Sequence, residues 1–221
     1  GSGTDSKALR ECLMCGVLCN DSLLSENEGQ WGIDGDPTEG ALVVAAEKAG
    51  IDTEALRKNL PREDEMPFDS SRQYMATLHG GDNPVIYLKG SVESLLERCE
   101  TMLGADGEDA PLDSDIIHQQ VNAMASQGQR VLAFARQVVP AGTTDIDHPQ
   151  VASGLTFIGL QGMIDPPREE AIRAVRACQT AGIRVKMITG DHAATAASIA
   201  GQIGLAGRLP EGETPDVLTG R

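Results

Sequence analysis

The order of apolar and polar positions divides the chain into two parts. In residues 5–150, helical spacing alternates with strand-like runs joined by short turns, which favours antiparallel pairing. From Leu155 onward, short apolar runs alternate with helical stretches, which is typical of a parallel α/β layer. We therefore predict an α+β domain in residues 4–164, with an antiparallel sheet and flanking helices, followed by an incomplete α/β segment in residues 165–221.

The segment GDPTEGALVVAAEKAG carries the signals of a helix start and a helix end. Asp36 suits the N-cap, Pro37 suits the first helical position, and Gly50 marks the end. These residues predict a helix from Pro37 to Lys48. Glu39 stands three residues after the cap, where a carboxylate can bind the cap's own N–H, and this position favours a structural role over a ligand contact.

The other elements of the first part follow from apolar spacing and turn residues. Two strand-like runs, Gln73–His79 and Val85–Leu88, flank a Gly-Gly-Asp-Asn-Pro turn and predict an antiparallel hairpin. We also predict helices at residues 5–20, just after Gly90 and at 116–127, a strand at Arg130–Val138, and loops at residues 26–34, 104–115 and 140–150.

In the second part the predicted order is strand 155–160, helix 168–181, strand 183–188 and helix 193–203. The Asp165-Pro-Pro-Arg168 segment near the domain boundary has two interpretations. Asp165 can be the N-cap of the following helix, with both prolines in its first turn. Alternatively, the two prolines stiffen a hinge between domains. The spacing alone leaves both open.

Composition restricts the class of partner. The chain has 221 residues, enough for two units, and 33 acidic against 18 basic residues give a net charge of -15. Such a surface repels polyanions and the basic residues do not cluster, so we expect no nucleic acid partner. No run reaches the roughly 18 to 20 apolar residues that span a bilayer. Residues 1–3, Gly-Ser-Gly, are typical of a cloning scar or linker.

Five cysteines, an odd number in a long chain, favour a reducing compartment over a disulfide framework. Cys12, Cys15 and Cys19 have the spacing of one helical stripe and lack a fourth metal ligand nearby. We therefore predict buried core thiols and no metal site.

Three residues of the first part are separate candidates for a ligand contact. Phe68 lies in a predicted Pro-Phe-Asp-Ser-Ser loop, where it can stack on a base or make a minor core contact. Lys89 stands at a strand-to-helix corner that favours anions. Arg130 begins a strand. For both cations the alternative is a solvated surface position.

Thr189 and Asp191 lie where a strand runs into a helix. Open α/β sheets bind ligands at this place, and a helix N-terminus there suits a phosphate or a phosphate-bound Mg²⁺. The alternative is that Asp191 only caps the helix. The Thr-Gly-Asp tripeptide does not decide between the two.

Six motifs taken together are more specific than any one of them. Between Gly35 and His192 the chain reads, in order, GDPTEGAL, PFDSSR, YLKGSVE, RVLAFA, DPPR and MITGDH. This order resembles the cytoplasmic nucleotide-binding region of P-type cation-transporting ATPases, most closely the calcium-pump branch. The resemblance implies a nucleotide-binding domain joined to part of a phosphorylation domain of haloacid-dehalogenase (Rossmannoid) type.

The resemblance also implies residue roles in ATP binding. Phe68 would stack on adenine, Glu39 would contact the adenine amino group, and Lys89 with Gly90 would line the base and phosphate pocket. The remaining implied roles are apolar walls for Met75 and Leu132, phosphate contact and domain bridging for Arg130, a hinge for Asp165 and Arg168, and support of the phosphorylation site for Thr189 and Asp191. Gln73 stands where the family often has a lysine, so either Arg72 substitutes for it or phosphate binding is weaker.

The family's nucleophile lies in an Asp-Lys-Thr-Gly-Thr segment, which does not occur in residues 1–221. We therefore expect a soluble fragment of the cytoplasmic part of a membrane pump, which binds ATP at an incomplete Mg²⁺ site without turnover. Its expected partners are the remaining phosphorylation, actuator and transmembrane domains. The fragment itself is expected to be monomeric, with pairing through its incomplete sheet as an alternative.

Two other functions fit the same residues. One is a stand-alone phosphohydrolase of the haloacid-dehalogenase superfamily, although the nucleophile pair that its covalent chemistry needs is not found in the α/β part. The other is a non-catalytic module that senses adenine nucleotides. The transported cation is not decided by this sequence, and calcium is the first candidate.

Overall fold

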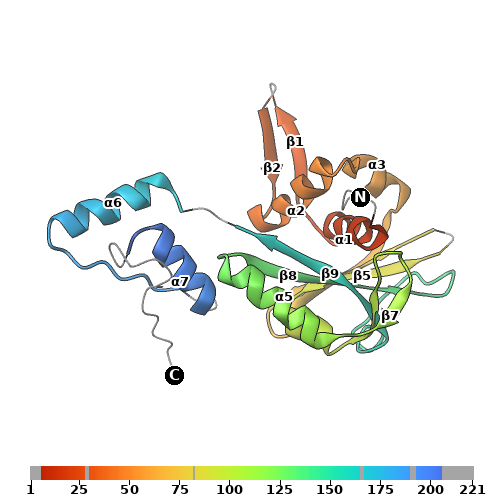
Figure 1. Cartoon of the computed structure of the whole chain (residues 1–221). Helices are drawn as coiled ribbons and strands as arrows, with labels where there is room; N and C mark the ends of the chain where they lie inside the picture. Colours follow the sequence, from red (N-terminus) through yellow and green to blue (C-terminus); the bar gives the residue numbers. More distant parts are fainter. Residues whose placement is uncertain (1–5, 28–29, 82, 165–166, 190–192, 206–221) are drawn as a thin grey trace. The chain divides into compact units, whose positions relative to one another are not determined.

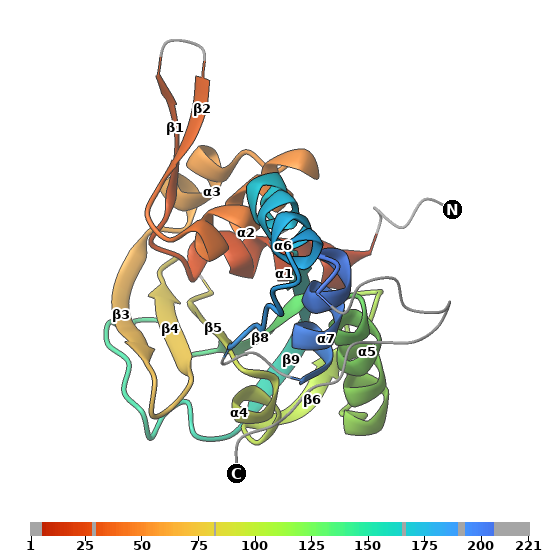
Figure 2. The same ribbon diagram turned by 90° about the vertical axis from the view of Figure 1, so that its left-hand side faces the viewer.

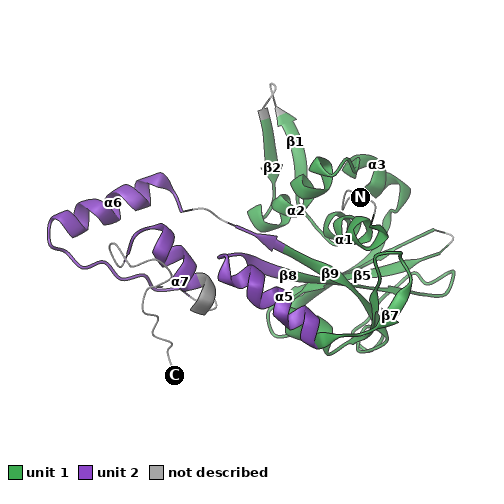
Figure 3. Ribbon diagram, in the orientation of Figure 1, with its two compact units in different colours: residues 1–114, 132–161 green, residues 115–131, 162–221 purple. Residues whose placement is uncertain are grey.

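The computed structural model describes residues 6–27, 30–81, 83–164, 167–189 and 193–205 (Figure 1). The chain forms two compact units (Figure 3), and each is described by itself. Unit 1 contains residues 1–114 and 132–161, and unit 2 contains residues 115–131 and 162–221. The predicted domain boundary at residue 165 stays a prediction. Asp165 and Asp191 lie outside the described residues.

Seven strands form one mixed sheet in the order β3-β4-β5-β8-β9-β6-β7. Their bounds are β3 Arg62–Asp69, β4 Tyr74–His79, β5 Val85–Gly90, β6 Cys99–Leu103, β7 Asp109–Pro111, β8 Arg130–Val138 and β9 Leu155–Met163. The predicted hairpin is confirmed as β4 and β5, which pair antiparallel from Tyr74–Gly90 to His79–Val85. The expectation of a purely antiparallel sheet is wrong, because β6 and β9 pair in parallel. Residues 155–160 therefore belong to this sheet and do not begin a separate α/β layer.

Four helices belong to unit 1: α1 Lys7–Leu18, α2 Pro37–Lys48, α3 Thr53–Asn59 and α4 Val92–Leu96. The bounds of α2 confirm the prediction from its caps. Oδ1 of Asp36 accepts the N–H groups of Thr38 and Glu39 at 2.8 and 3.2 Å. Helix α4 begins after Ser91, whose hydroxyl accepts the N–H of Ser94 at 3.2 Å.

Helix α1 lies against one face of the sheet (Figure 2). The thiol of Cys15 donates to the carbonyl of Leu88 at 3.5 Å. Glu11 accepts a hydrogen bond from the Tyr87 hydroxyl at 2.6 Å and pairs with Arg136 at 3.0 Å. Because side chains alternate along a strand, Tyr87 shares this face with the residues two positions away from it on β5.

A second hairpin occupies residues that we predicted to be a loop. Strands β1 Leu23–Asn27 and β2 Gln30–Asp34 pair antiparallel and form a two-stranded sheet of their own. The prediction was wrong because the segment is mostly polar and shows little apolar alternation. It is held to α2 by Ile33, since a Cβ on Gly40 would lie only 2.4 Å from Cγ2 of Ile33.

Three further described helices are α5 Ser114–Ser126, which belongs to unit 2 from residue 115 onward, and α6 Glu169–Thr180 and α7 Ala193–Gln202, which belong to unit 2 entirely. The predicted strand at residues 183–188 is wrong: these residues form no ladder, and Ile188 is 97% exposed. A strand needs a neighbouring strand to bond its backbone N–H and C=O groups, and the described part of unit 2 contains no strand that pairs with residues 183–188. Helix α6 begins at Glu169 with Arg168 as its N-cap, so Asp165 does not cap it. No described helix is long and apolar enough to cross a bilayer.

Candidate functional site

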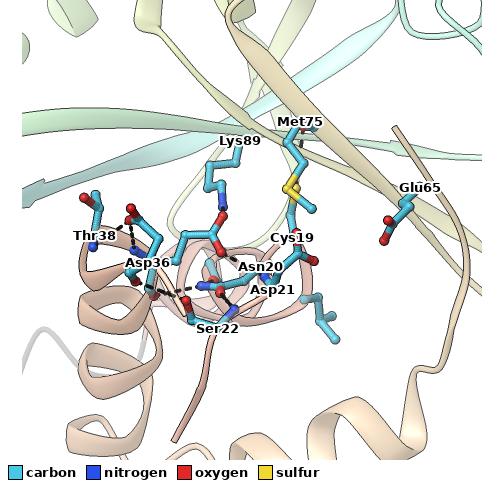
Figure 4. Close-up of polar contacts among 12 residues, drawn as sticks. Cys19, Asn20, Asp21, Ser22, Asp36, Thr38, Glu65, Met75 and Lys89 are labelled. Carbon is cyan, nitrogen blue, oxygen red and sulfur yellow. Dashed lines mark hydrogen bonds and ion pairs between the residues drawn. The ribbon is translucent and has the colours of Figure 1, made fainter. Parts of the chain in front are cut away.

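A buried ion pair joins Lys89 of β5, labelled in Figure 4, to Glu39 in the first turn of α2. Nζ of Lys89 lies 2.5 Å from Oε1 of Glu39, and the Lys89 side chain is only 7% exposed. The interpretation of Lys89 as a solvated surface residue is therefore wrong. A buried ammonium needs a partner of opposite charge, because moving a lone charge out of water costs roughly several kcal/mol.

Glu39 does not act as the partner of its own helix cap. Oε2 of Glu39 accepts the backbone N–H of Asp21 at 2.9 Å, while Oε1 binds Lys89. The carboxylate therefore points across to the end of α1 and to β5 and not back to Asp36. Two donors from separate elements fix the orientation of this side chain.

Apolar side chains lie beside Lys89 on the same face of the sheet. Met75 is the antiparallel partner of Lys89 on β4, and Phe134 is its partner on β8. Both are buried, whereas Leu132, two positions from Phe134 and so on the same face, is half-buried. Lys89 thus has apolar cross-strand neighbours on both sides, while the next pair along the same face, Tyr87 with Arg136, is polar.

Phe68 lies in β3 and not in a loop, so that prediction is corrected. The pairing of β3 with β4 shifts between Met66–Ala76 and Asp69–Tyr74, so three steps along β3 match two along β4. Such a bulge changes the face to which the following side chains point. In the register of Asp69 with Tyr74, the alternation puts Phe68 on the face of Met75. Phe68 is 62% exposed, which leaves its ring open to a ligand.

The turn between β3 and β4 contacts the end of β5. The carbonyl of Gln73 accepts the N–H of Ser91 at 2.9 Å, and Oε1 of Gln73 accepts the Ser91 hydroxyl at 3.1 Å. Gln73 has a φ of 61°, in the left-handed region. A Cβ on Gly90 would lie 2.4 Å from the Gln73 carbonyl oxygen. Gly90 therefore allows a close approach of two backbones.

Arg72, in the same turn, carries the one charge that could replace the family's lysine. Its Nε lies 3.8 Å from Oδ2 of Asp69, and both side chains are about half exposed. A surface ion pair of this length is weak, typically below about 1 kcal/mol. The guanidinium of Arg72 is therefore available to an anionic ligand.

The other predicted site residues belong to unit 2. Arg130 begins β8 and Arg168 precedes α6, and both are exposed. Thr189 ends the irregular stretch before the undescribed residues 190–192. The described contacts thus bring together Glu39 and Lys89 with their apolar neighbours.

The three N-terminal cysteines are core residues, as predicted. Burial raises the pKa of Cys12 to about 12 and that of Cys19 to about 11, and it raises the pKa of Cys15 as well. The thiol of Cys19 donates to the carbonyl of Met75 at 3.5 Å. No group of three or more potential metal ligands occurs among the described residues.

An open depression of about 220 Å³ lies on unit 1, close to the ion pair but not around it. Its lining residues are Leu18, Asn20, Asp21, Leu23, Arg57, Leu60, Arg62 and His79. Arg62 binds Asp21 at 2.6 Å, and the two ring nitrogens of His79 lie 3.0 Å from the Leu60 carbonyl and 2.9 Å from the Thr77 hydroxyl. We place the candidate site at Lys89 and not here, because none of the site residues predicted from the sequence lines this depression.

Sequence reasoning did not find Asn20 and Asp21, which hold Glu39 in place. The side chain of Asn20 is fully buried and forms three hydrogen bonds. The only sequence signal was an Asn-Asp-Ser run directly after a helix, which is common in ordinary turns.

The residues present fit an adenine nucleotide better than a protein-held metal. An exposed aromatic ring, an apolar wall, a carboxylate acceptor and a cation are the groups that an adenine ring and phosphates require. They occur here on Phe68, Met75, Glu39 and Lys89. ATP supplies a transferable phosphoryl group when bound. The described residues form no carboxylate cluster for Mg²⁺ of their own.

Comparison with known proteins gives the family. The model of the P-type ATPase cytoplasmic domain N matches residues 8–170. A protein named Cation-transporting ATPase pma1 from Synechocystis sp. is 56% identical over 198 residues, which cover 90% of this chain and 22% of the relative. Probable cation-transporting ATPase F from Mycobacterium tuberculosis is 46% identical over 214 residues, or 96% of this chain and 24% of the relative.

A protein named Calcium-transporting ATPase from Bacillus subtilis is 37% identical over 227 residues, which cover 99% of this chain and 25% of the relative. The chain thus spans about a quarter of the length of these relatives, between 22% and 25%. The family model and all three relatives agree, so the chain belongs to the P-type ATPases and matches their cytoplasmic domain N.

Proposed function

We propose that unit 1 binds ATP, with the adenine ring between Phe68 and the apolar face that contains Met75. Glu39 accepts a hydrogen bond from the adenine amino group, and Lys89 lines the pocket at its base. The observation that carries this proposal is the buried Lys89–Glu39 pair, 2.5 Å long, beside Met75 on the face of the sheet to which the register of β3 assigns the exposed Phe68.

The proposed roles of the remaining residues follow the resemblance. Leu132 is a second apolar wall, Gly90 admits the Gln73 turn, and Arg72 contacts the phosphates. Arg130, Arg168 and Asp165 act between nucleotide-binding and phosphorylation domains, while Thr189 and Asp191 support phosphoryl transfer. These residue roles come from the family motifs, and the geometry of Leu132, Gly90 and Arg72 is compatible with them.

For the whole protein we propose a pump that uses ATP and Mg²⁺ to phosphorylate an aspartate and so moves a cation across a membrane. The present chain would lie on the cytoplasmic side and work with phosphorylation, actuator and transmembrane domains. Calcium is the first candidate cation, since the Bacillus subtilis relative is named for calcium. Residues 1–221 contain no Asp-Lys-Thr-Gly-Thr segment, so they should bind ATP without hydrolysing it.

Calorimetric titration with ATP and with AMP, each with and without Mg²⁺, tests the proposal. The key variant is Phe68→Ala, and Trp31→Ala is its control, because Trp31 is an equally exposed aromatic residue on the β1–β2 hairpin. Stacking of a base on an aromatic ring contributes about 1–3 kcal/mol, so Phe68→Ala should weaken ATP binding about tenfold or more.

We expect ATP binding that persists without Mg²⁺, decreases in Phe68→Ala and is unchanged in Trp31→Ala. Equal affinities in the two variants would contradict an adenine site at Phe68. Absence of ATP binding by the unmodified chain would overturn the proposal as a whole. Steady ATP hydrolysis by the unmodified chain, abolished by Lys89→Ala, would contradict the expectation of no turnover.

A further inference from the structure

The segment Asn20–Ser22, which we call the Asn20 turn, follows α1 and is joined to the start of α2 by hydrogen bonds. Nδ2 of Asn20 donates to the Gly16 carbonyl and to the Glu39 carbonyl, each at 2.8 Å. Oδ1 of Asn20 accepts the N–H of Ser22, also at 2.8 Å. A fully buried amide with both donors and its acceptor in use fixes the backbone of this turn.

The Asn20 turn is held from a second side by Arg62 of β3. Nη2 of Arg62 donates to the Asn20 carbonyl at 2.7 Å, and Nη1 donates to Oδ1 of Asp21 at 2.6 Å. The turn therefore has little freedom to move relative to α2. Because the turn is held in place, the backbone N–H of Asp21 has a fixed direction.

The N–H of Asp21 determines how the carboxylate of Glu39 is oriented. It donates to Oε2 of Glu39 at 2.9 Å, while Lys89 donates to Oε1. With one donor on each oxygen, rotation of the carboxylate about its last bond would break at least one hydrogen bond. The remaining lone pairs of both oxygens therefore keep a fixed direction.

We propose that Asn20 is a positioning residue that sets the selectivity of the site for a 6-amino purine. This inference rests on the proposed function, because it assumes that Glu39 faces the base. An acceptor fixed opposite the 6-position pairs with the amino group of adenine but meets another acceptor in the 6-oxo group of inosine. A carboxylate that rotates can turn to the N1–H donor of inosine instead. Sites built for one hydrogen-bonding group discriminate by leaving buried polar groups unpaired with the wrong ligand. A carboxylate free to rotate would lose this discrimination.

The experiment compares ATP with inosine triphosphate (ITP), whose base has a 6-oxo group and an N1–H donor where adenine has a 6-amino group and an N1 acceptor. Dissociation constants of both are measured by calorimetry for the unmodified chain, for Asn20→Ala and for Thr53→Ala. Thr53 is a matched control, because it is also a buried polar residue of unit 1 and its hydroxyl donates to Oε1 of Glu47 at 2.6 Å. Partial unfolding of the protein raises the apparent dissociation constants of both nucleotides by the same factor, so the ratio of the two constants is independent of stability.

We expect the unmodified chain and Thr53→Ala to prefer ATP by about tenfold, and Asn20→Ala to prefer it by less than about threefold, a difference within reach of one hydrogen bond. A folded Asn20→Ala that keeps the full preference would overturn the role of Asn20. By contrast, equal binding of ATP and ITP by the unmodified chain would remove the premise that Glu39 reads the base.

Asn20→Ala leaves two carbonyls without their donor and could fail to fold. A measurement on the unmodified chain then decides. Although Asp21 is an exposed residue, its amide should exchange with solvent at least about a hundredfold more slowly than an unprotected amide, because it is bonded to Glu39. Exchange of the Asp21 amide at the unprotected rate would overturn the proposal.

Discussion

Lys89 and Glu39 stand 50 positions apart in the chain, and their charged groups lie 2.5 Å from each other. Each comes from an element that local sequence explains well: Glu39 from the first turn of α2, and Lys89 from the end of strand β5 in the β4–β5 hairpin. Neither residue needs the other to form its own element. The pair arises only when α2 packs next to β5, and it lies beside the apolar side chains of Met75 and Phe134.

The first prediction concerns the charge of Lys89. Lys89→Met keeps the apolar stem but removes the ammonium, and it should weaken ATP binding about tenfold or more, since hydrogen bonds to charged groups contribute about 1.5–3 kcal/mol. Lys48→Met is the control, because Lys48 is an exposed lysine at the other end of α2. Calorimetry compares the two, and equal losses would argue against a contact between Lys89 and the nucleotide.

Stability offers a separate check on the same pair. Lys89→Met leaves the carboxylate of Glu39 without its cation, and removing one partner of a buried pair typically destabilises by about 3–5 kcal/mol. The double variant Glu39→Gln with Lys89→Met should recover part of this loss in urea unfolding. If the double variant is the less stable of the two, the ion pair is not what holds these side chains.

A second prediction concerns the position where the family's lysine is replaced. Gln73→Lys adds a positive charge beside Arg72, so we expect ATP to bind about three- to tenfold more tightly at low salt, with the gain decreasing as salt screens the charge. Gln73→Met is the uncharged control of similar length. The affinities are measured at two salt concentrations. A gain that is the same in Gln73→Met, or that does not depend on salt, would not come from charge.

Local signals were sufficient for several elements. Helix α2 has a capping residue, a proline at its first position and a terminal glycine, and the β4–β5 hairpin has a Gly-rich turn between alternating runs. Strand β8 keeps its predicted bounds, Arg130–Val138. Each of these elements is specified by residues close to one another in the chain, so the sequence could predict it.

Non-local pairing explains the failures. The parallel pairing of β6 with β9 joins segments more than 50 residues apart, such as Cys99 with Leu155, and no local pattern encodes it. The apolar run at residues 183–188 has strand composition without a described partner strand. The face of Phe68 depends on a bulge, a feature of the register with β4 that the sequence of β3 alone does not reveal.

In the candidate site, too, local sequence predicted the elements but not the contacts between them. Residue-level patterns favoured a helix cap for Glu39 and a surface position for Lys89, and the family motifs were needed to bring these residues together. The structure pairs them because α2 and β5 are neighbours. Asn20 and Asp21 were missed by both approaches, since their contribution lies in hydrogen bonds across three elements.

The third prediction concerns the pH dependence of stability. Burial, with Arg62 and Arg57 nearby, lowers the pKa of His79 from its ordinary 6.5 to about 4, although a hydrogen bond to the Leu60 carbonyl opposes the shift. The unfolded chain therefore binds the proton more readily between pH 6.5 and 4. The free energy of unfolding should fall by about 2 kcal/mol between pH 7 and pH 5 through this residue.

Urea unfolding at several pH values measures this effect. The dependence should be weaker in His79→Gln than in the unmodified chain, whatever the loss of stability at pH 7. His118→Gln is the control, because His118 is exposed on α5, and it should keep the full dependence. The same slope in all three chains would mean that other groups carry the acid sensitivity.

The last prediction tests the close approach of β5 to the β3–β4 turn. A Cβ on Gly90 would lie 2.4 Å from the Gln73 carbonyl oxygen and 2.8 Å from Cβ of Tyr74, too close for either to be tolerated without a shift. Gly90→Ala should therefore destabilise unit 1 by about 1–3 kcal/mol, as overpacking does, and displace the Gln73 turn. Gly32→Ala, on β2, is the matched control: its added Cβ would lie 3.7 Å from Oγ of Ser25, an ordinary contact, so the stability of this variant should change by less than about 0.5 kcal/mol.

Urea unfolding measures the stability of both variants, and ATP binding by the folded fraction reports whether the Gln73 turn is displaced. Since the turn carries Arg72, a displaced turn should weaken the binding of ATP more than the binding of AMP. Equal stability of the two variants would show that the backbone at Gly90 has room for a side chain.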